Sequence, residues 1–369
     1  MKSRTKIALL FGGVSAEHDV SISSAESISR SIDRDRFDTI YIGIDKAGRW
    51  FMGDSVFDFL RQNTSSMPVR VILSTDPEKR GLLELDNPGK IIYVDVVFPV
   101  LHGPRGEDGT IQGMLDIAGI PYVGCGTLAS AIAMDKDMTK RVLKESGIPI
   151  VPGISIYKKE WTGKKEETLD RILASFKPPL FVKPACMGSS IGITRVTDPK
   201  DLPAALDMAL GFSEKAIVEP AVEDPLEIEV AILGNLEPMA SIPGQIIPSG
   251  EFYDFEAKYM DSASELIIPA RIDDALSDKI RETALGAFKA IGASGLARID
   301  FLVSRDTFYL NEINTLPGFT SISMYPKLWE ATGIPYKALI TRLIELAMER
   351  HKELSDLQKT IELKERLNA

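Results

Sequence analysis

Short apolar segments separated by glycine, proline and polar residues run through the first part of the chain. Residues 6–11, 39–44 and 91–99 each have the length and composition of a buried strand. The first segment runs into Gly12 and Gly13 and then into an amphipathic stretch rich in Ser and Ala, a pattern typical of a strand, a tight turn and a helix. The chain is therefore predicted to begin as an α/β fold.

Helices and strands continue to alternate towards the C-terminus. Helical spacing is found at residues 127–146, 199–211 and 273–292 and beyond residue 336. Strands are predicted at residues 216–220, 227–234 and 238–247. Residues 249–265 form a long polar and aromatic segment, and loops of this length are often lids or binding loops. We predict three domains, at residues 1–126, 127–215 and 216–369.

Two strand-like segments between residues 296 and 314 are separated by a short polar turn, which predicts a β-hairpin. A three-residue turn at residues 305–307 would place Asp300 opposite Glu312 and Arg298 opposite Asn314. These four side chains would then share one face, because alternate residues of a strand point the same way. A slip of one residue would move the polar set of one strand to the opposite face.

Two carboxylates and an amide oxygen on one face suit a hard cation such as Mg2+, which is usually held by few protein ligands together with substrate phosphates. Arg298 on the same face would meet negative charge that the metal does not neutralise. The alternative is a solvated hairpin face. The small and polar residues Thr320, Ser321 and Ser323 that follow favour the metal site, because an exposed hairpin has no need of them.

A second candidate site lies at residues 178–196, where apolar residues lead to Lys183 and then to a small loop at 188–190. Gly, Ser and backbone amides in such a turn can close over phosphates, and the lysine adds positive charge. The order of a Walker A motif is absent from the sequence, and an ordinary turn between strands is the alternative. Lys136, on the preceding helix, is by itself more typical of a solvated side chain.

Two further segments place polar residues near expected strand ends. Several glycines lie between residues 103 and 126, mixed with charged residues, and loops at the carboxyl ends of parallel strands bind ligands in open α/β sheets. Glu17 lies near the start of the first helix, where the helix dipole favours a carboxylate, although an ordinary first-turn acid is the alternative. The acidic residues between 219 and 229 either hold a ribose or face water.

Composition excludes several classes of function. A 369-residue chain with 44% apolar residues and a mean hydropathy of +0.01 is typical of a globular protein, and no apolar window is long enough to span a membrane. The N-terminus lacks the cleavage site of a signal peptide. Two cysteines, and three histidines without zinc-ligand spacing, fit a reduced cytoplasmic location. A net charge of −10 argues against nucleic-acid binding, and the missing G-x-G-x-x-G motif argues against a dinucleotide.

Seven motifs follow one another between residue 7 and about residue 343: GGVSAEHDVS, LHGPRGEDGTIQGMLD, AMDKDMTK, FVKPACMGSSIGI, FYDFEAKY, GLARIDF and LNEINTLPGFTSIS. In this order they resemble the D-alanine–D-alanine ligases, which are ATP-grasp enzymes. The resemblance implies an ATP-grasp fold with an N-terminal Rossmann-like domain, and ATP between the second and third domains. It implies that two D-alanines are joined through a D-alanyl phosphate for peptidoglycan synthesis. It also implies two Mg2+ ions, which Mn2+ can replace, and a homodimer.

Residue roles follow from the same resemblance. ATP contacts are implied for Lys136, Lys183, Ser190, Glu219, Glu227 and Lys258, and metal ligation for Asp300, Glu312 and Asn314. Substrate contacts are implied for Glu17 and His102 around the first D-alanine and for Ser323 and Met324 around the second. Tyr259, on the family's mobile loop, would link to Ser189 and Glu17, and Arg298 with the Gly318 amide would stabilise a tetrahedral oxyanion. The spacing between Glu219 and Glu227 is one residue longer than the family pattern, which bears on the adenine contacts.

Two other interpretations compete with this one. The first is a ligase of the same fold that takes D-lactate or D-serine as its second substrate. The second is a protein without catalysis, either a nucleotide binder on this scaffold or a dinucleotide-binding module. Intact Lys183, Arg298, Asp300, Glu312 and Asn314 argue against an inert binder. Phosphate release from ATP in the presence of D-alanine separates an enzyme from a binder.

Overall fold

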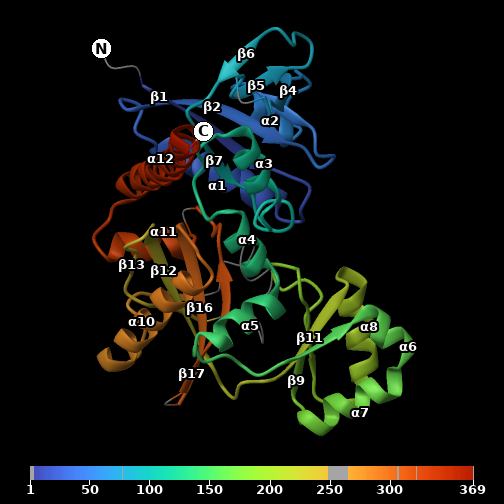
Figure 1. Cartoon of the computed structure of the whole chain (residues 1–369). Helices are drawn as coiled ribbons and strands as arrows, with labels where there is room; N and C mark the ends of the chain where they lie inside the picture. Colours follow the sequence, from blue (N-terminus) through green and yellow to red (C-terminus); the bar gives the residue numbers. More distant parts are fainter. Residues whose placement is uncertain (1–3, 77, 248–264, 306, 321, 369) are drawn as a thin grey trace.

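The computed structural model describes residues 4–76, 78–247, 265–305, 307–320 and 322–368, with side chains through residue 357. Three β-sheets follow one another along the chain, each with its own helices (Figure 1). A seven-stranded sheet comes first, a four-stranded sheet lies in the middle of the sequence, and the third sheet precedes the last two helices. This arrangement confirms the predicted α/β fold class.

The first sheet has the order β6-β5-β4-β3-β2-β1-β7, with parallel pairing from β2 to β7 at one end and antiparallel pairing from β2 to β6. Its strands are β1 (Thr5–Gly12), β2 (Phe37–Ile44), β3 (Trp50–Met52), β4 (Val69–Leu73), β5 (Gly81–Glu84), β6 (Ile91–Tyr93) and β7 (Val96–Val100), and its first helices are α1 (His18–Ser31) and α2 (Val56–Leu60). β1 pairs in parallel with β2 and β7, and its apolar run is buried on both faces. The carboxyl ends of these three strands therefore meet at one edge, where the chain enters α1.

The segment predicted as one strand at residues 91–99 forms two strands at opposite edges of this sheet. β6 and β7 are separated at Asp95. Its carboxylate accepts a hydrogen bond from the backbone N–H of Lys6 at 2.8 Å, and its own N–H donates to the Lys6 carbonyl at 2.9 Å. The prediction was wrong because both pieces are apolar, so hydropathy alone shows no break between them.

Helices α3 (Thr110–Ala118), α4 (Thr127–Met134) and α5 (Lys136–Glu145) lead from the first sheet to the second. The prediction of a single helix at residues 127–146 is wrong, because the chain breaks at Asp135. The Asp135 side chain accepts hydrogen bonds from the N–H groups of Asp137 and Met138 and so caps α5. Lys136 becomes the first residue of α5, which lies between the second and third sheets (Figure 1).

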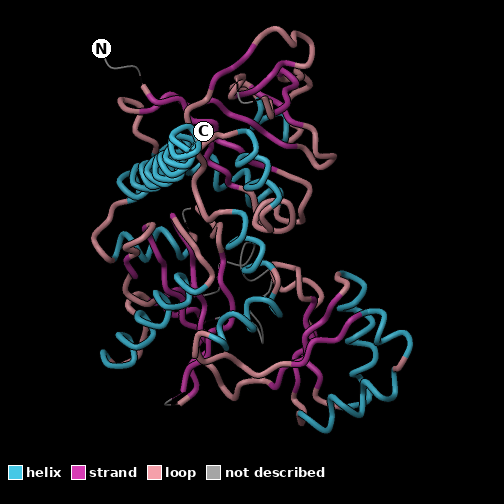
Figure 2. The backbone as a smooth tube through the Cα atoms, in the orientation of Figure 1, coloured by secondary structure: helices cyan, strands magenta, loops and turns pink. Residues whose placement is uncertain are grey.

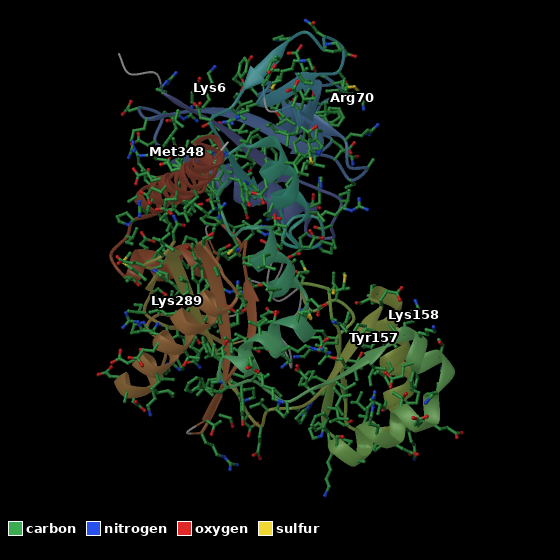
Figure 3. All side chains as sticks on the ribbon, in the orientation of Figure 1. Lys6, Arg70, Tyr157, Lys158, Lys289 and Met348 are labelled. Carbon is green, nitrogen blue, oxygen red and sulfur yellow. The ribbon has the colours of Figure 1, made fainter. Side chains whose placement is uncertain are left out.

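The four-stranded sheet has the order β10-β9-β11-β8, with every neighbouring pair antiparallel. Its strands are β8 (Ile154–Tyr157), β9 (Leu180–Pro184), β10 (Thr194–Val196) and β11 (Lys215–Pro220). Helices α6 (Lys158–Gly163), α7 (Lys165–Ser175) and α8 (Leu202–Phe212), with the short helix η1 (Pro199–Asp201), complete the unit around a core that contains Trp161. Figure 3 labels Tyr157 and Lys158, which mark the junction of β8 and α6.

The third sheet has the order β15-β14-β12-β16-β17, and β13 pairs with β12. Its strands are β12 (Leu226–Gly234), β13 (Met239–Ala240), β14 (Gly244–Ile247), β15 (Glu265–Ile267), β16 (Gly295–Ser304) and β17 (Thr307–Asn314). Helices α10 (Asp274–Ala290) and α11 (Met324–Ala331) both contact β12. The predicted domain boundary after residue 215 falls at the start of β11, which pairs within the four-stranded sheet, so the change of sheet comes after Pro220.

The hairpin of β16 and β17 has the predicted register at the polar residues. Asp300 pairs with Glu312 and Arg298 with Asn314. The predicted three-residue turn is wrong, since Ser304 pairs with residue 307 and leaves a two-residue turn. A β-bulge between the 300–312 and 301–310 pairs adds one residue to β17. This extra residue compensates for the shorter turn, so the pairs at Asp300 and Arg298 are the predicted ones.

The last helix, α12 (Tyr336–Asn368), returns to the first sheet (Figure 2). It packs against α1 and β7, and one hydrophobic cluster joins Ile7, Phe98 and Ile344 with Leu296 of the third sheet. The first and third units therefore share a core, whereas the limits of the three domains stay a prediction. No helix in the described part of the chain is long and apolar enough to cross a membrane.

Candidate active site

A buried charge network on the hairpin face holds Arg298 between two carboxylates. Its Nε and Nη2 donate to Asp300 at 2.8 Å and 2.7 Å, and its Nε lies 3.0 Å from Glu229 Oε2. Asn314 Nδ2 donates to Asp300 Oδ2 at 2.9 Å. Burial works to lower the pKa of Arg298, but the carboxylates of Asp300 and Glu229 raise that pKa well above its ordinary value. The guanidinium is therefore a permanent positive charge on this face.

The same face offers oxygen donors to a hard cation. Asp300, Glu312 and Asn314 converge through the register of the hairpin, and Glu312 Oε2 lies 4.0 Å from Lys136 Nζ. Within the described residues there is no group of three or more acidic, histidine or cysteine side chains arranged to hold a metal. Two carboxylates and one amide still fit Mg2+, because this ion commonly takes one or two carboxylates and completes its shell with water and substrate phosphates.

A cavity of about 500 Å³ lies between the second and third sheets, within the usual range of ligand pockets. It is lined by five of the residues expected to contact ATP, together with two of the expected metal ligands: Lys136, Lys183, Ser190, Glu219, Glu227, Asp300 and Glu312. Asn311 and Glu312 are consecutive yet line the same cavity, which the β-bulge explains because it re-aims a side chain.

Glu219 is a strongly perturbed carboxylate of this cavity. Its two oxygens lie 2.6 Å from Lys140 Nζ and 2.8 Å from Lys183 Nζ, and its side chain is 4% exposed. Burial acts to raise its pKa, but the two ammonium groups prevail and lower the pKa to about 2. Lys183 also reaches Asn311 Oδ1 at 3.5 Å. The carboxylate is therefore ionised and shared between two lysines.

A second, smaller cavity of about 60 Å³ lies beside the first. Its lining includes five of the expected substrate and catalytic residues: Glu17, His102, Ser189, Arg298 and Gly318. The two cavities adjoin, because Lys136, Gly188 and Glu312 line both. A group bound in the larger cavity therefore meets a group bound in the smaller one at these residues.

The wall of the smaller cavity joins the first and second units. Ser189 Oγ donates to a carboxylate oxygen of Glu17, 172 residues away in the sequence. Ser189 and Ser190 have φ angles of 51° and 58°, in the left-handed region that is strained for residues other than glycine. Such strain persists where the surrounding structure holds it, and it gathers at binding sites.

His102 and Glu107 line the smaller cavity together with Glu17. His102 Nδ1 donates to the Leu316 carbonyl at 3.0 Å, and burial lowers the pKa of His102, so its ring is neutral. Burial and the nearby Glu17 raise the pKa of Glu107 to about 8, while its Oε1 accepts from the Gly103 N–H at 2.8 Å. Sequence reasoning gave no role to Glu107, although it lies in the glycine-rich loop already singled out.

Two expected residues, Ser323 and Met324, are not among the lining residues of these two cavities, although Ser323 packs against Gly318. Ser323 accepts a hydrogen bond from the Thr320 N–H at 3.0 Å, and Met324 is buried at the start of α11 against Gly244. Lys258 and Tyr259 lie outside the described residues.

The fold and the paired cavities define an ATP-grasp enzyme, and comparison with known proteins gives the family. The family description "D-ala D-ala ligase N-terminus" matches residues 6–125, and "D-ala D-ala ligase C-terminus" matches residues 142–345. The chain belongs to the D-alanine–D-alanine ligase family, which confirms the resemblance read from the seven motifs.

Individual relatives cover nearly the whole chain. A D-alanine–D-alanine ligase of Heliobacterium modesticaldum is 49% identical over 351 residues, which is 94% of this chain and 95% of the relative. The structure of the Coxiella burnetii D-alanine–D-alanine ligase has a TM-score of 0.87 at 35% identity, covering 98% and 99% of the two chains. The VanG D-Ala:D-Ser ligase of Enterococcus faecalis has a TM-score of 0.85 at 36% identity, covering 94% and 100%.

Proposed function

We propose that this chain joins two D-alanines to D-alanyl-D-alanine for peptidoglycan synthesis, with ATP converted to ADP and phosphate. The family match and the curated relatives support this activity. The single structural observation that carries the proposal is the junction of the two cavities at Lys136, Gly188 and Glu312. Phosphoryl transfer needs a nucleotide and an amino acid to meet at one point, and this junction supplies it.

Nucleotide binding is assigned to the larger cavity. Lys136 and Lys183 would hold the phosphates, and the loop that contains Ser190 would cover them. Glu227 would hold the ribose, and Glu219 would lie near the adenine. Their positions on the cavity wall support these roles. Asp300, Glu312 and Asn314 would hold Mg2+ or Mn2+, which would neutralise charge on the transferring phosphoryl group.

The first chemical step takes place at the junction of the cavities. A carboxylate oxygen of the first D-alanine attacks the terminal phosphorus of ATP, the bond to the bridging oxygen breaks, and ADP leaves. The product is D-alanyl phosphate. Glu17 would bind the ammonium of this D-alanine, with Ser189 fixing the Glu17 carboxylate and neutral His102 packing close to the substrate. Catalysis here is chiefly positioning and electrostatics.

The second step forms the peptide bond. The unprotonated amine of the second D-alanine attacks the acyl carbon, and inorganic phosphate leaves from the tetrahedral intermediate. Arg298 and the Gly318 amide would donate to the oxyanion, because both line the smaller cavity. Ser323 and Met324 would border the second D-alanine, and Lys258 and Tyr259 would act from the segment outside the described residues. No covalent intermediate with the enzyme is needed.

The test is product analysis with purified protein, ATP, Mg2+ and D-alanine. We expect ADP, phosphate and D-alanyl-D-alanine in equal amounts, separated by chromatography. Competition of D-alanine with D-serine and D-lactate decides the second substrate, and a majority of either mixed product would replace this proposal by the alternative ligase. Nucleotide binding without phosphate release would leave only an inert binder.

Two further proposals rest on the family resemblance. The protein would be a homodimer and would act in the cytoplasm, on small-molecule substrates. Light scattering of the purified chain gives its mass in solution, and a monomer at micromolar concentration would overturn the first proposal. Fractionation of cells with a periplasmic and a cytoplasmic marker tests the second.

A further inference from the structure

Lys140 is a buried lysine of α5 for which the proposed reaction has no role. It lies one helical turn after Lys136, and its side chain is only 13% exposed. Its Nζ is 2.6 Å from Glu219 Oε1 and donates to the Val151 carbonyl at 2.8 Å. An ammonium is rarely buried without a charged partner, so the contact with Glu219 is what allows Lys140 to stay in this position.

Lys140 lies behind Glu219 with respect to the nucleotide cavity. Lys136, Lys183 and Glu219 belong to the cavity lining, whereas Lys140 is absent from the described residues that line it. Glu219 thus has one oxygen on Lys183, which faces the cavity, and the other on Lys140, which is set back from it. Lys140 contacts the cavity lining through the Glu219 carboxylate and through the carbonyl of Val151, and Glu219 is the charged partner of the two.

The two ion pairs of Glu219 should respond differently when a nucleotide binds. On the proposed function, the Lys183 ammonium moves to the phosphates and leaves its oxygen of Glu219. Without Lys140, a carboxylate that is 4% exposed would then be a buried charge without a counter-ion, which is costly. Lys140 does not line the cavity and therefore meets no bound phosphate. It can remain paired with Glu219 throughout.

We propose that Lys140 is a positioning residue of the nucleotide site, which keeps the Glu219 carboxylate neutralised so that Lys183 can transfer to the phosphates. This inference rests on the proposed function and deepens it. A static ion pair that only ties α5 to β11 is the competing explanation. The two differ in what they predict for nucleotides with and without phosphates.

The experiment measures the dissociation constants of ATP, ADP and adenosine by calorimetry, and the KM values of ATP and D-alanine, for four proteins. These are the native chain, Lys140→Met, Lys140→Arg and the control Lys144→Met, which removes an exposed lysine one turn further along the same helix. We expect Lys140→Met to weaken ATP and ADP tenfold or more and adenosine less than threefold, with the KM of D-alanine unchanged. Lys140→Arg should recover most of the loss, and Lys144→Met should bind like the native chain.

A double variant makes the test independent of folding defects. In a Glu219→Gln background there is no buried anion to neutralise, so adding Lys140→Met should change ADP affinity less than threefold. An equal loss in both backgrounds, or an equal loss for ADP and adenosine, would overturn the inference. Failure of the proposed function is seen separately, as a native chain that binds ATP but releases no phosphate with D-alanine, and the binding measurements still decide the role of Lys140.

Discussion

Replacing Arg298 by methionine should destabilise the protein far more than a matched change at the tip of the same hairpin. Arg298 is 14% exposed and bridges Asp300 and Glu229, whose side chains are 13% and 5% exposed. Methionine keeps much of the length of the side chain but removes the charge. Both carboxylates then stay buried without the cation that held them together.

The size of the loss in folding free energy follows from the burial of this ion pair. Breaking a buried ion pair by removing one partner costs about 3–5 kcal/mol, a large part of a total stability of about 5–15 kcal/mol. Lysine at this position keeps the charge but cannot reproduce the two parallel bonds from Nε and Nη2 to Asp300. Arg298→Lys should therefore cost about 1.5–3 kcal/mol, the value of one hydrogen bond to a charged group.

The control is Arg305→Met, which breaks an ion pair with Glu223 of similar length, 2.9 Å, between side chains that are 80% and 72% exposed. Exposed pairs contribute less than about 1 kcal/mol. Urea unfolding followed by circular dichroism measures all three variants, with the slope checked for a change in cooperativity. If Arg298→Met and Arg305→Met lose equal stability, the buried network does not hold the hairpin face, and the reasoning from burial is refuted.

Four further outcomes are expected. Glu312→Gln should lose most turnover with little change in melting temperature, whereas Asp300→Asn should lose both turnover and stability because it removes a buried charged partner of Arg298; near-normal turnover of either variant at limiting Mg2+ would remove the metal assignment. Lys183→Ala should weaken ATP binding or slow phosphate release, with incomplete rescue by Lys183→Arg, and unchanged kinetics would reject this. Tyr259→Phe should gain D-alanyl-D-lactate synthesis, most clearly at low pH where the competing amine is protonated, and a native product ratio at every pH would count against it. Burial raises the pKa of Glu107 to about 8, so the folded state keeps a proton that the unfolded state loses. The free energy of unfolding should therefore fall as pH rises from about 4.5 to about 8. Thermal melts across this pH range should show a smaller fall for Glu107→Gln.

The local pattern of residues was enough to predict most of the elements and one part of the site. Strand β1, helices α1 and α10 and the pairing of Asp300 with Glu312 all follow from periodicity, glycine positions and strand alternation. The hairpin register was right although its turn was not. The observed turn is one residue shorter than predicted, and the bulge adds one residue to the second strand, so the two differences cancel at Asp300.

The seven motifs also determined the family, because motifs in one order over nearly the whole chain constrain it more than any single pattern does. Hydropathy did not separate β6 from β7, which are both apolar, and did not show the cap that divides α4 from α5. In both cases one aspartate sets the break, through a side-chain hydrogen bond to a backbone N–H. An isolated acid in a periodic segment is a weak signal.

Tertiary structure alone decided which distant polar and charged side chains meet. Glu17 reaches Ser189 and Arg298 reaches Glu229 across the boundaries between units or strands, and Lys140 and Lys183 share Glu219 from a helix and a neighbouring strand. The physical reason is that periodicity reports only which face of its own element a side chain occupies. Which other element covers that face, and whether the charge there is buried with a partner, depends on how the three sheets pack, and that packing raised the pKa of Glu107 and lowered that of Glu219.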